Sequence, residues 1–273
     1  MDYVLNHSLY ELLSNTRDLN SNNIFDPESD GVNLNRNTGF NWVHGDSYAN
    51  SGSNQYYRGN QAYSEKEMQA LQQLLNEEKI EFSVMNITDT DSNFKVVYPY
   101  NWAQLRPSPD YIPFNMLSEN ISNAMNVIDN QWSAQANTKR NANLSDELYV
   151  NYGITPITFS FEDYSVLPDS SALYHLKNQF QAGIQAFMNH LINYQDVTSN
   201  KPGLLELLVI DNQNNSPLAA EIRIDQKHSN AFKRNLSNAE NGCYYRFLDE
   251  GNYTITVQKK GFNPSVQNIS IGN

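Results

Sequence analysis

The residues in this chain whose types and spacing best suit chemistry lie in the turn-rich segment Gly31–Trp42, where Arg36 stands between Asn35 and Asn37. Arginine presents a planar fork of N–H donors that matches a carboxylate in bidentate fashion, and asparagine amides can add hydrogen bonds to it. Asn35 and Arg36 are therefore candidates for binding a carboxylate or a similar anion. The alternative is that Arg36 ties down its own loop through backbone carbonyl groups.

Glu162 is the second candidate, because it ends a stretch, Ile154–Phe161, that alternates apolar and polar residues as a strand does. Open α/β sheets place functional groups at the carboxyl ends of their strands. There Glu162 can act as a general base that activates water. The alternative is an acid at a solvated strand end, or one paired with a helix terminus.

Histidine and cysteine residues show no metal-binding pattern. None of the five histidines begins a His-x-x-Glu pattern, and the single cysteine, Cys243, provides neither a cysteine-based zinc site nor an intrachain disulfide. His44 is the histidine best placed for a pocket near the arginine loop, although a hydrogen bond within its own loop is the simpler role. His175 and His190 are expected on a long helix, facing solvent or the margin of the core. Cys243 is predicted to be a buried, inert thiol at the start of a strand.

The net charge argues against nucleic acid and anionic membranes as the main partners. With a formal net charge of -12 and a pI near 4.8, the chain is not expected to bind nucleic acid or anionic membranes as its main role. No apolar run approaches the roughly 20 residues needed to span a bilayer. The first residues, Met1–Val4, do not resemble a signal peptide, while several Asn-x-Ser/Thr sequons permit a secreted location.

The elements that must position these residues begin with an α/β region over residues 1–200. Ser64 and Glu67 predict a capping box at the start of an amphipathic helix. Helical spacing is also present over Met116–Ile128, and a long amphipathic helix is expected from Asp169 or Ser170 to Tyr194. Strands are expected at Ile80–Val84, Lys95–Tyr100 and Ile154–Phe161.

A second region is expected after the linker Thr198–Gly203, where the pattern changes to short strands separated by turns. Residues 203–273 therefore predict a small antiparallel β-sandwich of about 70 residues, near the lower end of what folds alone. Its expected strands are Leu204–Ile210, Ala219–Ile224, Tyr244–Phe247, Tyr253–Val257 and Val266–Ile271.

Several of these strings, in order along the chain, resemble segments of the zinc metallocarboxypeptidases of the carboxypeptidase A/B type. Gly31–Asn37 resembles the Gly-Val-Asp-Leu-Asn-Arg-Asn segment of that family, and Tyr98–Tyr100 resembles its Tyr-Pro-aromatic strand end. Asp146–Tyr149 is similar to its Asp-Asp-Trp-x-Tyr element, with the tryptophan replaced. Phe159–Glu162 is similar to its Phe-Thr-Phe-Glu strand, and Tyr57–Glu67 to its helix start.

The resemblance implies a fold, a reaction and a cofactor. The fold would be a carboxypeptidase-type mixed sheet with flanking helices, followed by a transthyretin-like regulatory domain, whose signature hairpin Leu248–Val257 resembles. The reaction would be zinc-dependent removal of C-terminal residues from peptides, and an extracellular location is expected for the family. Asn35 and Arg36 would bind the terminal carboxylate, with Arg17 as a second substrate-binding arginine, and Glu162 would be the general base.

The chain departs from the family pattern at the zinc ligands. The family takes two ligands from a His-x-x-Glu motif, which this chain does not contain, so the chain is expected to begin downstream of it. The third family ligand is a strand histidine, and Asn86 stands at about that position within Glu81–Ile87. A neutral amide is a poor zinc ligand. Two hypotheses follow: a metallocarboxypeptidase whose zinc ligands this chain does not show, or a non-catalytic homologue that binds peptide C-termini. A gene fragment that does not fold fully is a third alternative.

Overall fold

The computed structural model describes residues 18–19, 21–24, 30–44, 57–89, 94–102, 106–128, 131–138, 143–162, 170–192, 202–227 and 235–272. Arg17 and two of the histidines, His7 and His228, lie outside the described residues. Of the linker expected at Thr198–Gly203, the structure describes only the last two residues. The side chain of Glu162 also lies outside the description.

A four-stranded mixed sheet forms the centre of the first region. Its strand order is β1 (Phe82–Asp89), β6 (Thr155–Glu162), β2 (Lys95–Tyr98) and β5 (Ser133–Ala136). β1 is parallel to β6 and β2 is parallel to β5, whereas β2 runs antiparallel to β6. The predicted mixed α/β fold is therefore confirmed, and three of its strands lie where the sequence predicted them, with shifted ends.

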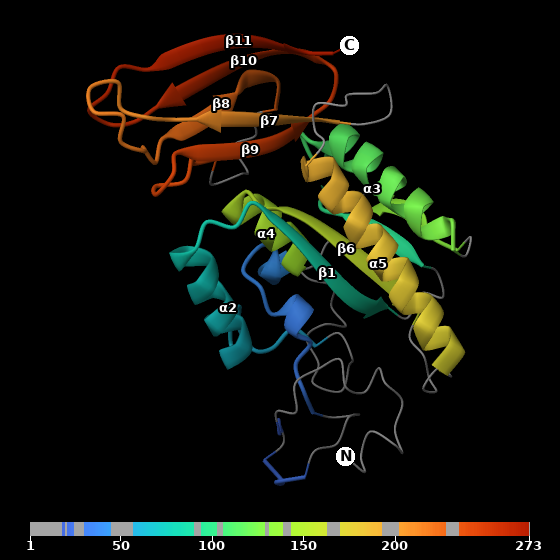
Figure 1. Ribbon diagram of the computed structural model, residues 1–273. Helices are drawn as coiled ribbons and strands as arrows, with labels where there is room; N and C mark the ends of the chain where they lie inside the picture. The colour runs from blue at the N-terminus through green and yellow to red at the C-terminus, as the bar shows by residue number, and fades with distance from the viewer. Residues whose placement is uncertain are drawn as a thin grey trace.

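Helices cover both sides of this sheet (Figure 1). α3 (Tyr111–Asn126) and α5 (Ser170–Ile192) lie together on one side, and α2 (Lys66–Glu77) and α4 (Leu144–Tyr152) lie on the other. Smaller elements are η2 (Leu34–Arg36), η3 (Trp42–His44), β3 (Asn101–Trp102) and β4 (Arg106–Pro107). Within the residues that the structure describes, no helix has the length and apolar character required to cross a bilayer.

The close packing of α5 on the sheet depends on Gly183. A Cβ at this position would lie 2.8 Å from Met125 Sδ on α3 and 2.9 Å from Phe159 Cζ on β6. Both distances are shorter than real Cβ contacts, so only glycine allows the helix backbone to approach both neighbours. The core here is largely aromatic, with Phe159 stacked on Phe180 at 5.7 Å between ring centroids.

The predicted capping box at the start of α2 is wrong. The helix begins at Lys66, and its N-cap residue, Glu65, makes no side-chain capping bond. Ser64 instead donates to Glu65 Oε1 at 2.6 Å and accepts a hydrogen bond from Asn37 at 2.9 Å. The hydroxyl group needed for the capping box is therefore engaged by a residue far away in the sequence.

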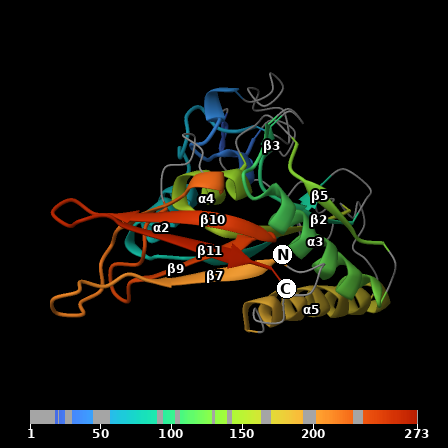
Figure 2. The same cartoon turned by 90° about the horizontal axis from the view of Figure 1, so that it is seen from above.

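The second region contains two antiparallel sheets that pack face to face (Figure 2). One pairs β7 (Gly203–Leu208) with β9 (Cys243–Leu248), and the other has the order β11 (Ser265–Ile271), β10 (Gly251–Gln258) and β8 (Glu221–Ile224), the last followed by η5 (Asp225–Lys227). Apolar side chains from both sheets form one core between them. Cys243 is partly exposed, so the predicted buried thiol is wrong, because the first residue of β9 lies outside this core.

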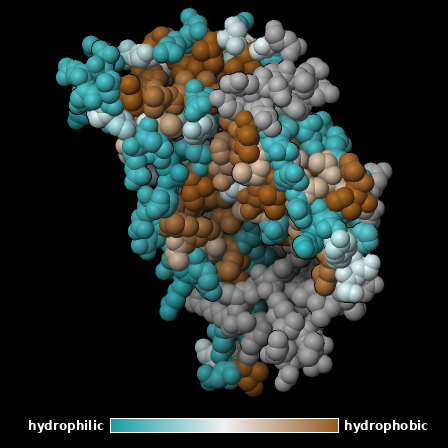
Figure 3. Space-filling model, in the orientation of Figure 1, coloured by the Kyte–Doolittle hydropathy of each residue, from teal (hydrophilic) through white to brown (hydrophobic). Residues whose placement is uncertain are grey.

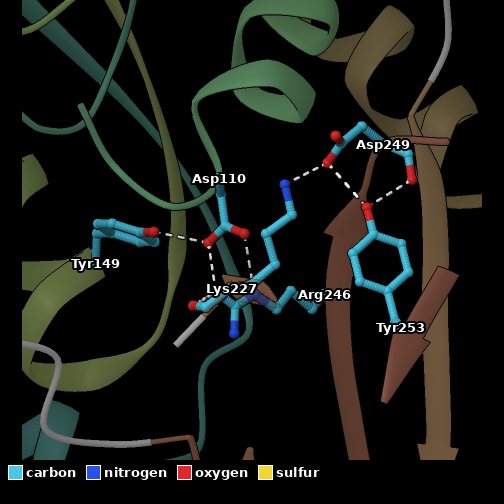
Figure 4. Close-up of polar contacts among 6 residues, drawn as sticks. All are labelled: Asp110, Tyr149, Lys227, Arg246, Asp249 and Tyr253. Carbon is cyan, nitrogen blue, oxygen red and sulfur yellow. Dashed lines mark hydrogen bonds and ion pairs between the residues drawn. The ribbon is translucent and has the colours of Figure 1, made fainter. Parts of the chain in front are cut away.

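The two regions share core and polar contacts. Leu204 and Phe247 belong to the hydrophobic core of the first region, and the Phe82 ring lies 5.7 Å from that of Phe247. Asp110, at the start of α3, accepts two hydrogen bonds from Arg246 of β9, at 3.0 and 2.9 Å (Figure 4). Tyr149 of α4 donates to the same carboxylate at 2.6 Å. Charged groups thus join the two regions inside the protein.

Candidate functional site

Arg36 ends the short helix η2 and is buried, with an exposed fraction of 5%. Asn35 precedes it and is half-buried. The Oδ1 atom of Asn35 accepts a hydrogen bond from the Leu144 N–H at 3.2 Å, which joins the loop to the start of α4. This bond fixes the amide plane of Asn35 and leaves its nitrogen as the donor end. The structure therefore brings Asn35 and Arg36 to the N-terminal end of α4.

Asn37 has a structural role that differs from that of its neighbours. Its side chain is fully buried and donates to Arg58 O, Gln61 O and Ser64 Oγ at 2.8, 3.1 and 2.9 Å. Its Oδ1 atom accepts from the Glu65 N–H at 3.1 Å. Asn37 thereby holds the segment before α2 against the arginine loop.

Asp146 of α4 is the acidic neighbour of Arg36. It is 1% exposed and accepts hydrogen bonds from the Tyr100 N–H at 2.9 Å and from Asn137 Nδ2 at 3.0 Å. Burial raises the pKa of Asp146 to about 7, although both hydrogen bonds and the charge of Arg36 lower it. Near neutral pH this carboxyl group is therefore only partly ionised, and the charge of Arg36 is only partly balanced by it.

Glu147, the next residue, ties the loop after Arg36 to α4. Its carboxylate accepts from Tyr63 Oη at 2.6 Å, from the Phe40 N–H at 2.5 Å and from Asn151 Nδ2 at 2.7 Å. Burial, followed by the contact with Glu147, raises the pKa of Tyr63 well above its usual value, so its hydroxyl stays protonated and remains a donor. Sequence reasoning noted Asp146 and Glu147 only as part of a motif, because nothing in the residue types shows that these acids are buried.

A cleft of about 580 Å³ lies beside these residues. It is bounded by the loop from Gly39 to His44, by α2 and by α4, and Glu147 and Tyr63 form part of its wall. His44 is exposed and is one of the residues that line this cleft. The size is that of a small-molecule site.

Glu162 is the last residue of β6, as predicted, and its backbone pairs with Asp89 of β1. Asn86 of β1 lies opposite Phe159, and its side chain is exposed. The two positions that the resemblance assigned to the general base and to the strand ligand thus lie on adjacent parallel strands.

Comparison with known proteins shows which family this chain belongs to. A family model described as zinc carboxypeptidase matches residues 3–183. This chain belongs to the zinc carboxypeptidase family. The two antiparallel sheets at the C-terminal end lie beyond the matched range. No curated protein sequence matches the chain.

Solved structures agree on the fold. The crystal structure of thrombin-activatable fibrinolysis inhibitor is similar with a TM-score of 0.52 and 21% identity, covering 67% of this chain and 48% of that one. The bovine protein, in complex with tick carboxypeptidase inhibitor, gives a TM-score of 0.53 and 20% identity, covering 67% of this chain and 62% of its own. Carboxypeptidase A from Helicoverpa armigera gives a TM-score of 0.46 and 16% identity, covering 64% of this chain and 45% of that one. This zinc carboxypeptidase family member thus spans 45% to 62% of the length of these chains. At 20% and 21% identity, the two structures with TM-scores above 0.5 show a shared fold alone.

Zinc is the metal that the family implies, and the donor groups of the described residues do not fit it. Among those residues there is no group of three or more His, Cys, Asp or Glu side chains that could hold a metal ion. His44 and His175 are exposed on separate helices, and His190 Nδ1 lies 3.3 Å from Ala186 O within α5. A zinc site requires three protein ligands that converge on one point.

Proposed function

We propose that this zinc carboxypeptidase family member binds the C-terminal carboxylate of peptides through Asn35 and Arg36 without hydrolysing them. The observation that carries the proposal is the buried guanidinium group of Arg36, held at the end of η2 beside Asp146. A guanidinium in a site of low dielectric constant interacts with a carboxylate far more strongly than one in water. The amide nitrogen of Asn35 would add one hydrogen bond.

The charge of Asp146 controls how strongly such a site attracts an anion. An ionised Asp146 would repel an anionic ligand at Arg36, whereas a protonated Asp146 would not. Because the pKa of Asp146 is about 7, both forms are populated near neutral pH. The proposal therefore predicts that carboxylate affinity increases as the pH falls through this range.

Peptidase activity is the second candidate function, and two observations favour it: family membership and the position of Glu162 at the end of β6. In this alternative Glu162 would act as the general base, with Arg17 as a further substrate-binding residue. A carboxylate without a metal ion to lower the pKa of water is a weak hydrolytic catalyst. Since the described residues supply no converging zinc ligands, we favour binding over hydrolysis.

Calorimetric titration of an N-acetylated dipeptide and of its C-terminal amide tests the binding site. The free acid is expected to bind and the amide is not, and Arg36→Gln is expected to weaken binding at least about tenfold, which corresponds to about 1.4 kcal/mol. Arg223→Gln is the matched control, because Arg223 of β8 forms an exposed ion pair with Asp225 of η5. Equal binding of acid and amide, or an unaffected Arg36→Gln variant, would contradict the proposal.

Metal content and hydrolysis separate the two candidate functions. The purified chain is expected to retain no stoichiometric zinc after dialysis and to leave the dipeptide intact when zinc is added. Stoichiometric zinc together with chelator-sensitive hydrolysis would establish the peptidase and would show that residues outside the described ranges complete the metal site.

We also propose that residues 203–273 form a transthyretin-like regulatory domain, and that the protein is extracellular as family members are expected to be. The antiparallel sheets around one apolar core support the first proposal. For the second, expression in secreting cells and mass analysis of glycosylation at the exposed sequon residue Asn252 provide the test.

A further inference from the structure

A second cavity, of about 230 Å³, lies where the α/β region meets the C-terminal sheets. The ends of α2 and α4 line it on one side, and Ala219 and the residues from Leu236 to Ala239 line it on the other. Figure 1 shows α2 ending close to the C-terminal sheets. This junction cavity shares Asn76 and Tyr152 with the cleft described above, so the two spaces adjoin. The residues of the proposed carboxylate site line neither of them.

The junction cavity is lined largely by apolar side chains. Leu75 and Ile154 are 8% and 2% exposed and belong to one hydrophobic cluster, against which Ile80 packs. Leu236 adds an apolar side chain from the C-terminal region. A cavity of about 150 Å³ already accepts a molecule of the size of benzene, whereas drug-sized ligands require roughly 300 Å³ or more. The junction cavity therefore suits a short apolar chain or a single ring.

The wall from the C-terminal region is held in place by hydrogen bonds. The hydroxyl group of the buried Ser237 donates to Leu218 O at 2.6 Å and accepts from the Ala220 N–H at 3.0 Å. The Ser237 N–H donates to Ala220 O at 3.0 Å, and Leu236 forms an antiparallel bridge with Glu221. A wall that is already ordered loses little conformational freedom when a ligand binds.

The side of the junction cavity formed by α2 is acidic. Glu77 is the last residue of α2 and Glu78 is its C-cap residue, and both are exposed and line the cavity. The last turn of α2 contains no basic residue, and a helix C-terminus itself carries a partial negative charge. Figure 3 shows hydrophilic surface beside apolar surface where α2 approaches the C-terminal sheets. The two carboxylates and the helix end therefore add their negative potentials at one place.

Two lysine residues lie near these carboxylates but are engaged elsewhere. Lys79 lines the cavity, and its Nζ atom lies 3.4 Å from Glu81 Oε2, which offsets its charge. Lys259 donates to Ala219 O at 3.0 Å without lining the cavity. The half-buried ring of Tyr152 also lines the cavity, and the face of an aromatic ring attracts cations. The charges and the ring favour a cationic ligand.

We propose that the junction cavity binds a primary ammonium group carried on a short apolar chain, which is the chemistry of a lysine side chain or of a free alkylamine. The apolar chain lies against Leu75, Ile154 and Leu236, and the ammonium group lies at Glu77 and Glu78. The net charge of -12 attracts cations to the molecule as a whole. Because the ligand touches both regions, its binding stabilises their junction. This binding does not depend on the carboxylate site.

Titration of the purified chain with butylammonium, 1-butanol and butanoate, followed through methyl NMR signals, tests the proposal. Butylammonium is expected to shift the signals of Leu75, Ile154 and Leu236 together, with only millimolar affinity because the ligand has so few atoms. The neutral 1-butanol is expected to bind about fivefold more weakly, since an exposed ion pair contributes up to about 1 kcal/mol. Butanoate is expected not to bind.

A lysine derivative blocked at both ends, Nα-acetyl-lysine methylamide, identifies the source of the ammonium group. Binding as strong as that of butylammonium would assign the cavity to lysine side chains of a polypeptide. Binding of butylammonium alone would assign it to free amines. Either result supports the proposed ligand chemistry.

Variants separate the acidic side from the apolar lining. Replacing both acids, Glu77→Gln with Glu78→Gln, is expected to weaken butylammonium binding about fivefold and to leave 1-butanol binding unchanged. Glu67→Gln, in the first turn of α2, is the matched control. Leu236→Trp fills the cavity and is expected to abolish binding of both probes. Arg36→Gln is expected to change neither.

Three results would overturn the proposal. One is equal binding of butylammonium, 1-butanol and butanoate, and another is the absence of shifts that involve methyl groups of both regions. The third is an equal loss of butylammonium binding in the Glu67→Gln control and in the double variant. The double variant changes two exposed side chains and keeps the test decisive if Leu236→Trp does not fold.

Discussion

At Asp146 two effects of opposite sign act on one carboxyl group. Desolvation favours the protonated form, while Asn137, the Tyr100 N–H and the charge of Arg36 favour the ionised form. Desolvation is the larger effect, so the pKa of this residue lies near 7 instead of near 4. The residue beside the candidate carboxylate site thus changes charge within the physiological pH range.

This shift has a consequence for stability. Because the pKa of Asp146 is higher in the folded chain than the 3.8 of an exposed aspartate, the folded state binds more protons between these two pH values. The contribution of Asp146 to the free energy of unfolding is therefore complete below pH 3.8 and is lost, by about 1.4 kcal/mol per pH unit, as the pH rises through about 7. Urea unfolding of wild type and Asp146→Asn across this range measures it. A difference between the two proteins that does not vary with pH contradicts the shift.

Glu147 is expected to matter for stability because three donors converge on its carboxylate. Glu147→Gln places an NH2 group against one of these donors, Tyr63 Oη or the Phe40 N–H, and leaves a buried donor unsatisfied. The expected loss is about 1–3 kcal/mol in the free energy of unfolding. Tyr63→Phe removes one of the donors and is the control: in the Tyr63→Phe background the Gln substitution should cost less. Additive losses would show that the contact with Tyr63 is not the cause.

At the scale of elements, hydrophobic periodicity predicted three of the four strands of the sheet and the two long helices, with shifted ends, but not β5. β6 and α5 lie where their alternating and helical patterns placed them, because those patterns reflect burial of one face or stripe. The pattern did not predict α4, which has polar residues buried on it, nor the start of α2, which is set by Asn37. Such contacts join residues distant in sequence and leave no local periodicity.

The sequence likewise pointed to only some of the residues of the candidate site. Asn35 and Arg36 were proposed from residue types and spacing, since an arginine between asparagines suits anion binding, and their role stays a prediction. The neighbouring acid Asp146 could not be assigned its environment, because only the folded chain brings it beside Tyr100 and Asn137.

Asn37 links two elements, and its removal is expected to affect both. Asn37→Ala leaves the Glu65 N–H and two backbone carbonyl groups before α2 without their side-chain partner inside the protein. The expected cost is roughly 3 kcal/mol or more, since each buried unsatisfied group costs about 1–3 kcal/mol. Asn35→Ala, which removes one partly buried bond, should cost less than half as much. Thermal unfolding of both variants tests the ranking, and equal losses would contradict it.

For the whole molecule, the question is whether residues 203–273 unfold separately from the α/β region. Leu204 and Phe247 lie in the core of that region, and the buried pair of Asp110 and Arg246 crosses the junction. Lys227, whose carbonyl group accepts from Arg246, also pairs with Asp249, to which Tyr253 donates (Figure 4). Shared core and buried charge favour one cooperative unit over two independent domains.

Single substitutions in the buried pair test this coupling. Arg246→Met leaves Asp110 buried with the Tyr149 hydroxyl but without its cation, and Asp110→Leu leaves Arg246 without its anion, so each is expected to cost about 3–5 kcal/mol. The double variant removes both charges and should be less destabilised than the sum of the two, because neither charge is then left uncompensated. Calorimetry should show one unfolding transition that moves as a whole in every variant. Two transitions, only one of which responds to Arg246→Met, would show that the C-terminal sheets unfold on their own, and the junction would then be a contact between independent domains.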